Sequence, residues 1–325
     1  MHLINDHNNF NNTLTFIVPS QGKDLSPLTR HRPQALMPFG REQRIIDFAL
    51  SNCWNSGIRK AFVLPDRHLQ LVSQYLDSFD WNGNLITVSP DPSRRYTGSA
   101  DALFQNVGVL QLYAPEYVLV LLTDHIYEMD YGRLVRFHME HGGQVTIATN
   151  GVHDIGVFLF KATAFRKLLL VDALAKGNQN LDQSVVFRAA ARHEIHMLDI
   201  AAEGGTYWGC VENIDSYYQT QMNFCRQLGG EVGVVLPSVQ IAPTAVVRNS
   251  IVLKGAHIGH DARIRKSIIE EDVRIPDASL IGFDPKTDRR NFVVSAGGVV
   301  VVDRNNVERI RQKDQKLTFT FARAA

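Results

Sequence analysis

The stretch Tyr117–Tyr131, which reads YVLVLLTDHIYEMDY, decides the fold class of this chain. It opens with an apolar run, Val118 to Leu122, and Asp124 follows almost at once. A short apolar run bounded by polar residues is typical of a buried strand. Ligands of open α/β sheets bind beyond the carboxyl ends of the strands, so Asp124 is predicted to lie at a ligand site.

Similar apolar runs alternate with amphipathic stretches from Leu14 to about Phe224. The expected strands are Leu14–Val18, Ala61–Leu64, Leu85–Val88, Tyr117–Leu122, Gln144–Thr149 and Val157–Phe160. The expected helices include Ile45–Asn55, Leu69–Leu76, Ala100–Leu112 and Tyr131–His141. This alternation predicts βαβ units and a mostly parallel sheet with helices on both faces.

A different pattern starts near Val234. Apolar residues recur there at steps of five or six, at positions 241, 247, 252, 258, 264, 269, 275 and 281. Ile241, Ile258 and Ile275 are 17 residues apart. A near-six repeat predicts a short left-handed parallel β-helix whose coils have three faces, with the apolar residue of each face pointing inward. We therefore expect an α/β domain over 13–228 and a β-helix over 234–310.

Composition places the chain among ordinary globular proteins. Of its 325 residues 45% are hydrophobic and 21% charged, and the net charge of +1 argues against nucleic-acid binding. No apolar run approaches the roughly 20 residues of a membrane span. The polar N-terminus predicts a disordered tail over 1–12 rather than a signal peptide. Cys53, Cys210 and Cys225 form neither an even set nor a metal spacing, which favours a reducing cytoplasm.

Two segments resemble a known family. Arg44–Ile58, which reads RIIDFALSNCWNSGI, and Tyr117–Tyr131 are similar to ADP-glucose pyrophosphorylase, also called glucose-1-phosphate adenylyltransferase. The resemblance runs from about Leu14 to about Val302 with one large internal deletion. It implies a nucleotidyltransferase-like (Rossmann-like) domain, a substrate pair of ATP and glucose 1-phosphate, and Mg²⁺ as the cofactor of an active member.

Several positions depart from the family's catalytic pattern. In the segment Thr15–Thr29, which corresponds to the family's glycine-rich phosphate loop, Pro19 replaces a glycine and Gly22 is kept. Pro19 has no N–H to offer a phosphate. Asp24 stands at the position of the catalytic arginine, and Gln34 at that of a lysine near the nucleotide phosphates. Each change removes a positive charge or a donor that phosphoryl transfer needs.

The resemblance also implies a metal site and a sugar site. Asp124 keeps the first of two carboxylates that hold Mg²⁺, whereas Cys210 replaces the second, and a thiol is a poor Mg²⁺ ligand. After the strand Gln144–Thr149 the family has a long segment with the glutamate and lysine that bind glucose 1-phosphate. Here Asn150 leads almost directly to Ile155, so that segment is missing.

Other family positions are kept. Tyr96, Gly98, Ser99 and Asp101 belong to a motif that can meet the nucleotide at a helix start, although a helix-capping role explains the same residues. Arg32 remains from a basic cluster that faces a sugar-phosphate effector in bacterial relatives, or it is a solvated surface charge.

The combined losses favour a non-catalytic or regulatory paralogue. We expect it to form a homo-oligomer, or a hetero-oligomer with a catalytic homologue. No cofactor is predicted with certainty, and Mg²⁺ is expected only if the chain is active. The run Val299–Val302 supports assembly, since an exposed apolar run would act as an open strand edge. We expect a subunit interface over Leu253–Val302; packing of the run on the first domain is the alternative. Two other functions remain open: an active adenylyltransferase with a rebuilt Mg²⁺ site, using another carboxylate such as Asp215, and a free-standing sensor of a nucleotide or sugar phosphate.

Overall fold

The computed structural model describes residues 10, 12–19, 25–90, 94–151, 153–175, 180–190, 195–203, 207–227 and 233–306. Contacts divide the chain into two compact units. Unit 1 contains residues 1–21, 32–36 and 45–210, and unit 2 contains residues 22–31, 37–44 and 211–325. Most of the expected tail over 1–12 lies outside the described residues. The contacts group residues 211–227 with the β-helix; our division at 228–234 stays a prediction.

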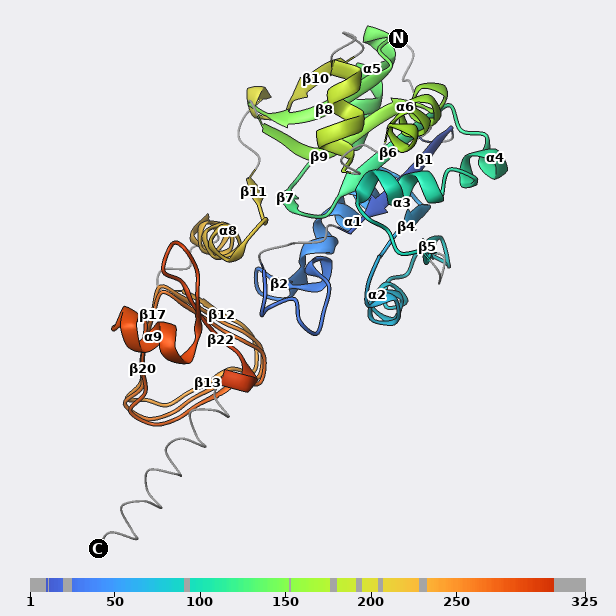
Figure 1. Cartoon of the computed structure of the whole chain (residues 1–325). Helices are drawn as coiled ribbons and strands as arrows, with labels where there is room; N and C mark the ends of the chain where they lie inside the picture. The colour runs from blue at the N-terminus through green and yellow to red at the C-terminus, as the bar shows by residue number, and fades with distance from the viewer. Residues whose placement is uncertain are drawn as a thin grey trace, which may run out of the picture. The chain divides into compact units, whose positions relative to one another are not determined.

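Unit 1 is built on a seven-stranded sheet in the order β10-β8-β9-β6-β1-β4-β5 (Figure 1). The strands are β1 (Thr13–Val18), β4 (Ala61–Val63), β5 (Leu85–Thr87), β6 (Tyr117–Leu122), β8 (Val145–Asn150), β9 (His153–Lys161) and β10 (Ile195–Asp199). Strand β9 runs antiparallel to β6 and β8, and every other pair in this sheet is parallel. The mostly parallel sheet is therefore confirmed.

Helices cover both faces of the sheet because β6 is apolar on both sides. Leu119 and Leu121 join one buried cluster, and Val118 and Val120 join another. The first cluster takes its helical residues from α1 (Ile45–Asn55), α2 (Leu69–Leu76), α5 (Tyr131–His141) and the short η2 (Gln34–Leu36). The second takes them from α3 (Ser99–Gln105), α4 (Val109–Tyr113), α6 (Ala162–Leu174), η3 (Leu181–Val186) and α7 (Phe187–Ala190).

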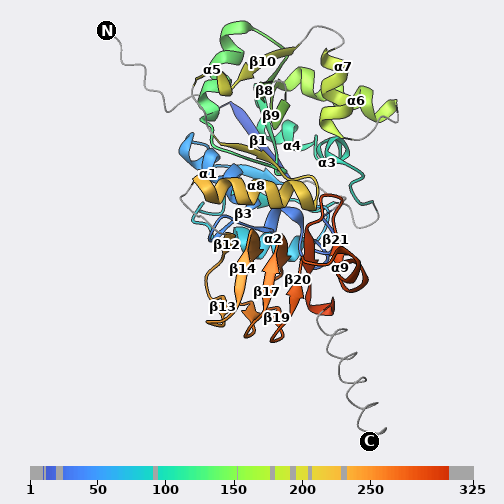
Figure 2. The same ribbon diagram turned by 90° about the vertical axis from the view of Figure 1, so that its left-hand side faces the viewer.

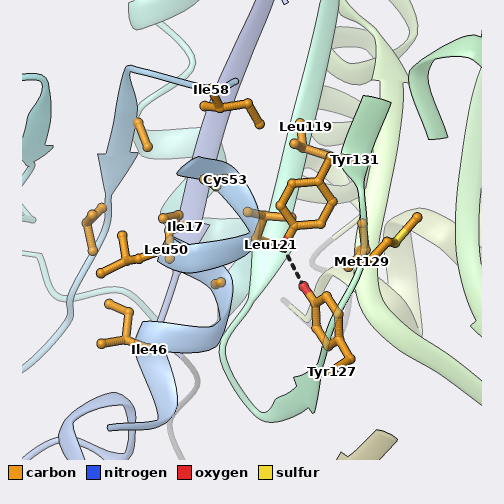
Figure 3. Close-up of a cluster of buried hydrophobic side chains, with 14 of the residues drawn as sticks. Ile17, Ile46, Leu50, Cys53, Ile58, Leu119, Leu121, Tyr127, Met129 and Tyr131 are labelled. Atoms are coloured by element: carbon orange, nitrogen blue, oxygen red, sulfur yellow. Dashed lines mark hydrogen bonds between the residues drawn. The ribbon is translucent and has the colours of Figure 1, made fainter. Parts of the chain in front are cut away.

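The two segments that carry the family resemblance contact each other in unit 1. The Asn52 side chain on α1 donates to the carbonyl oxygen of Tyr127 at 3.0 Å and accepts from the amide of Met129 at 3.2 Å. The Tyr127 and Tyr131 hydroxyls are 2.8 Å apart inside the same cluster (Figure 3). A buried amide satisfied on both sides fixes the chain just after β6.

The single helix expected over Ala100–Leu112 is wrong, because the chain forms α3 and α4 with a break between them. Asn106 lies at the break, where its side-chain amide donates to the carbonyl of Ala102 and to the Tyr96 hydroxyl, both at 2.8 Å. An Asn side chain that bonds locally competes with the helical ladder, and Gly108 follows two residues later.

A two-stranded antiparallel pair follows β6. It joins β7 (His125–Tyr127) to β11 (Trp208–Cys210), with Cys210 opposite His125 and Trp208 opposite Tyr127. The short η4 (Ala201–Glu203) precedes β11. This pair brings the late part of unit 1 to the carboxyl end of β6.

Unit 2 contains the expected β-helix, a left-handed prism with three parallel sheets (Figure 2). One sheet contains β12 (Gly233–Val235), β15 (Ser250–Val252), β18 (Ser267–Ile269), β22 (Val300–Val302) and β21 (Val293–Val294), the last of which is antiparallel to β22. The second contains β13 (Gln240–Ile241), β16 (His257–Ile258) and β19 (Arg274–Ile275). The third contains β14 (Val246–Arg248), β17 (Arg263–Arg265) and β20 (Leu280–Ile281).

The 17-residue period is confirmed in the strand register. Ile241 pairs with Ile258 and Ile258 with Ile275, and the side chains of Ile258 and Ile275 are buried inside the prism. Turn residues with positive φ share the period, for example Ser238, Gly255 and Asp272. The sequence repeat therefore encodes both the inward side chains and the corners of each coil.

The run Val299–Val302 is buried within unit 2, because β22 pairs with β18 on one side and with β21 on the other. Helix α9 (Pro285–Asn291) precedes β21. The run is thus a strand of the last coil and not an open edge. Our argument from an exposed run no longer supports a subunit interface over Leu253–Val302, and that interface stays a prediction.

Helix α8 (Ile214–Gln227) and the hairpin of β2 (Pro38–Phe39) and β3 (Gln43–Arg44) complete unit 2. Tyr217 on α8 donates to the carbonyl of Pro38 at 2.6 Å, and the Gln221 side chain accepts from the amide of Gly40 at 2.9 Å. Helix α8 also contacts β12 and β15. No helix among the described residues is long and apolar enough to cross a membrane.

Candidate nucleotide and metal site

Asp124 lies at the carboxyl end of β6, as expected, and Cys210 reaches the same place on β11. The His125 imidazole lies between them: its Nδ1 is 2.9 Å from Asp124 Oδ1, and it also forms a hydrogen bond to Cys210. Sequence spacing does not predict this contact, because Asp124 and Cys210 are joined only through the pairing of β7 with β11.

The electrostatics of this cluster favour a positively charged His125. Burial disfavours the imidazolium, but the hydrogen bonds to Asp124 and Cys210 outweigh burial and raise the pKa of His125 to about 10. A carboxylate next to a cation keeps its own charge without a metal. The negative charge at the end of β6 is therefore balanced by a side chain of the same unit.

An aromatic stack completes the cluster. The Trp208 indole lies between two imidazoles, with ring centroids 6.0 Å from His125 and 5.7 Å from His153. Trp208 Nε1 is buried and has no hydrogen-bond partner among the described residues. Sequence reasoning missed both His153 and Trp208 as members of this site. In the sequence Trp208 stands out only as part of a family motif. No pattern around His153 indicates that its ring stacks on a tryptophan.

His153 reaches Trp208 because β8 and β9 are joined by a tight hairpin. Asn150 pairs directly with His153, and Gly151 in the turn has a φ of +65°. A bulge follows on β9, where Gly156 has a φ of +74° and a Cβ would lie 2.9 Å from His125 Nδ1. Glycine at this position lets the backbone of β9 approach the site closely.

Magnesium does not fit the side chains in this cluster. Mg²⁺ requires hard oxygen ligands in near-octahedral geometry, whereas this cluster offers one carboxylate, an imidazole and a thiol. The Asp124 carboxylate is also engaged by His125. Among the described residues, no group of three His, Cys, Asp or Glu side chains could hold a metal ion.

The polar groups of the segment from Arg94 to Asp101 form hydrogen bonds with one another and with the following helix. The Asp101 carboxylate accepts from the amide and hydroxyl of Thr97 at 2.9 and 3.0 Å, from Gln105 at 2.9 Å and from Arg94 at 3.0 Å. These contacts tie the loop to the first turn of α3. The N-cap of α3 is Gly98, without a side-chain cap, so the capping role that we gave to Ser99 is wrong.

The neighbouring residues of this motif also have partners within unit 1. The Ser99 hydroxyl accepts from the amide of Leu181 at 2.9 Å. Tyr96 is buried and its amide donates to Asp66 at 3.2 Å. Gly98 has an extended backbone with a φ of 174°, which any residue could adopt. These contacts give Tyr96 and Ser99 a structural role in the fold, and contact of this motif with a nucleotide stays a prediction.

Comparison with known proteins gives two family matches. Residues 20–155 match the family described as nucleotidyl transferase, and residues 225–302 match the GlmU-like, C-terminal hexapeptide family. The glucose-1-phosphate adenylyltransferase of Koribacter versatilis (strain Ellin345) is 26% identical over 390 residues, covering 87% of this chain and 93% of that protein. The enzyme of the same name from Dechloromonas aromatica (strain RCB) is 27% identical, covering 90% of this chain and 90% of that protein. The one from Yersinia pestis bv. Antiqua (strain Antiqua) is 25% identical, covering 96% of this chain and 88% of that protein.

Over most of its length the chain is similar to proteins named glucose-1-phosphate adenylyltransferase, and its two parts match the nucleotidyl transferase and GlmU-like hexapeptide families.

The alignment with the Koribacter relative is longer than this whole chain, at 390 against 325 residues. Some residues of the relative therefore have no counterpart in this chain, which is the pattern that an internal deletion produces. The nucleotidyl transferase match ends at residue 155, beside the β8–β9 hairpin where we infer that deletion.

Of the remaining positions named from the ADP-glucose pyrophosphorylase resemblance, Pro19, Arg32 and Gln34 lie in unit 1. Gln34, in the place of the family lysine, is buried in η2, and Arg32 lies half-buried just before it. Pro19 is buried directly after β1. Gly22 and Asp24 lie outside the described residues.

Asp215, the carboxylate that a rebuilt metal site of this family would use, has another role. Its Oδ1 accepts from the Ser295 hydroxyl at 2.5 Å, and its Oδ2 accepts from the amide of Gly297 at 2.8 Å. Both oxygens are thus used to hold the turn between β21 and β22 inside unit 2. This finding weighs against Asp215 as a substitute Mg²⁺ ligand.

Proposed function

We propose that this chain is a non-catalytic, regulatory paralogue of glucose-1-phosphate adenylyltransferase in ADP-glucose and glycogen metabolism. The observation that carries the proposal is the position of Cys210. It contacts His125 beside Asp124, where the resemblance implies a second Mg²⁺ carboxylate. A thiol and an imidazolium cannot replace the divalent cation that neutralises a transferring phosphoryl group.

The β8–β9 hairpin supports the same proposal. Direct pairing of Asn150 with His153 leaves only residues 151 and 152 between the strands. The sugar-phosphate segment of active members cannot be built from that turn. Trp208 then stacks on His153, so the side of the cluster next to the hairpin is closed by aromatic rings.

We expect that the purified chain does not make ADP-glucose. The assay measures pyrophosphate released from ATP and glucose 1-phosphate in the presence of Mg²⁺. Absence of turnover is expected because the metal, phosphate and sugar sites are each altered. A turnover number of about 1 s⁻¹ or more, within the usual enzyme range, would contradict the proposal and favour an active enzyme with a rebuilt site.

A restored variant sharpens this test. The double substitution Asp24→Arg and Cys210→Asp returns two family side chains but leaves the sugar segment missing. We expect no turnover from this variant either. Rescue of activity would mean that the two substitutions, and not the deletion, had removed catalysis.

A further inference from the structure

The three faces of the β-helix differ in what covers them. Ile251 and Ile268, in the first sheet, are not part of the buried cluster inside the prism and are nevertheless fully buried. Helix α8 contacts β12 and β15 of that sheet. The third sheet, formed by β14, β17 and β20, has an exposed outer surface, which we call the β14 face (Figure 2).

The outward residues of the β14 face follow from strand alternation. Ile264 and Ile281 point into the prism and are buried, so their neighbours along the strands point outward. The outward positions, which are all exposed except the half-buried glycine, are Val246, Arg248, Arg263, Arg265, Leu280 and Gly282.

Three of these residues are arginines on adjacent strands. Arg248 pairs directly with Arg265 across β14 and β17, and Arg263 lies two residues before Arg265. Like charges directly opposite each other in a sheet are destabilising. A face that retains them loses some stability, and a negatively charged partner would recover it.

The charges on this face are only partly balanced by the chain itself. Arg265 donates from Nε to the carbonyl of Gly282 at 2.8 Å, stacks on Phe283 at 4.5 Å, and lies within electrostatic range of the buried Asp288. Arg248 and Arg263 form no ion pair among the described residues. Two guanidinium groups therefore point into solvent from a rigid sheet.

Large apolar side chains lie among these arginines. Val246 and Leu280 are the direct strand partners of Arg263 and are 42% and 62% exposed. Phe283, beside Arg265, is 41% exposed. Arginine, aromatic and aliphatic residues together are typical of protein–protein interfaces, whereas small anions bind in concave sites.

We propose that the β14 face binds an acidic surface of a catalytic homologue of this chain. The proposal rests on the proposed function, which requires such a partner, and adds where the partner binds. The arginines set the charge of the surface they recognise, because guanidinium groups pair bidentately with carboxylates. The exposed Val246, Leu280 and Phe283 supply the apolar contact area.

The test uses the full chain and the glucose-1-phosphate adenylyltransferase of the same cell, mixed and measured by sedimentation velocity. The variant is Arg248→Glu with Arg263→Glu. The matched control is Lys254→Glu with Arg274→Glu, which reverses two exposed charges elsewhere on the β-helix. All four side chains are exposed, so neither variant should melt below the wild type. Relief of the repulsion between Arg248 and Arg265 should slightly raise the melting temperature of the β14 face variant.

The β14 face variant should bind the homologue about tenfold more weakly or worse, and the control should stay within about twofold of the wild type. Raising NaCl from about 0.05 M to about 0.5 M should weaken the wild-type complex more than the variant complex. Equal affinity of variant and wild type would overturn the assignment of this face while leaving the proposed function standing.

Two other outcomes also overturn it. A wild-type chain that never associates with the homologue would remove the proposed function and this inference together. A chain that self-associates through the β14 face, with the arginine variant alone failing to do so, would show that the partner is a second copy of the chain.

Discussion

His125 contacts both positions whose side chains, by the family resemblance, would hold a metal ion in active relatives. Its ring holds the Asp124 carboxylate on one side and the Cys210 thiol on the other. The charge of the carboxylate is thus balanced by the His125 imidazolium of the same unit. We propose that the Asp-to-Cys difference implied by the family resemblance replaces a cation site with an internally balanced cluster.

The three cysteines should differ in reactivity. Burial raises the pKa of Cys53 and of Cys225, so both thiols stay protonated at neutral pH. Cys210 is half-buried beside the His125 imidazolium, and a neighbouring cation is typical of reactive cysteines. We expect one fast equivalent when the native chain reacts with a disulfide reagent such as dithionitrobenzoate.

Two variants assign that fast phase. Cys210→Ser should abolish it, and His125→Gln should slow it about tenfold because the neighbouring cation is lost. A fast phase that persists in Cys210→Ser would contradict the expected order of reactivity.

His138 should make the stability of the fold depend on pH. Burial, with smaller contributions from Lys161 and His196, lowers the pKa of His138 to about 4, and its Nδ1 lies 2.7 Å from the Thr146 hydroxyl. The unfolded chain, with an ordinary histidine pKa near 6.5, binds a proton more readily than the folded chain. Stability from the neutral ring is therefore present above pH 6.5 and is lost as the pH falls toward 4.

The measurement compares urea unfolding of the wild type and His138→Gln at pH 7 and pH 5. Between these values the wild type should lose about 1–2 kcal/mol more than the variant, whose amide does not titrate. Equal losses in the two proteins would show that His138 does not contribute to the acid sensitivity.

At the scale of elements, each coil of the β-helix depends on its neighbours. The isoleucine ladder of the second sheet shows this dependence: Ile258 is 3% exposed between two coils, whereas Ile241 in the first coil is 39% exposed. Burial in a solenoid comes from stacking, and a terminal coil has a neighbour on one side only.

Ile258→Asp should therefore disrupt unit 2. An unpaired charge in the prism costs several kcal/mol, enough to abolish cooperative unfolding of that unit. Ile241→Asp is the matched control and should lower the melting temperature far less, because the carboxylate can reach water. Circular dichroism melting curves check both, and an unchanged melting temperature for Ile258→Asp would refute the repeat assignment.

Periodic elements could be predicted from sequence, and contacts between distant segments could not. The bounds of α1, α2 and α5 coincide with the expected ones, since amphipathic spacing is a local signal. The break at Asn106 depends on a side-chain bond to Tyr96, which spacing does not contain. Asp124 and Cys210 were named from family motifs, but the stack of Trp208 on His125 and His153 required the strand pairing.

For the whole molecule, the proposed function requires association. We expect analytical ultracentrifugation to show a homo-oligomer, or a complex when the chain is mixed with a glucose-1-phosphate adenylyltransferase of the same cell. Burial of Val299–Val302 within unit 2 means that any interface must use other surfaces. A strict monomer in both experiments would end the regulatory hypothesis and favour a free-standing sensor of a nucleotide or sugar phosphate.

The β8–β9 hairpin explains how so large a deletion left the sheet intact. Asn150 and His153 are directly paired across β8 and β9. The two ends of any loop inserted between them are therefore already held close together. The length of such a loop changes the chain entropy only slowly and leaves the strand register untouched. The hairpin tip is thus a graft point, where a substrate-binding loop can be lost in evolution or inserted by an engineer without redesigning the scaffold.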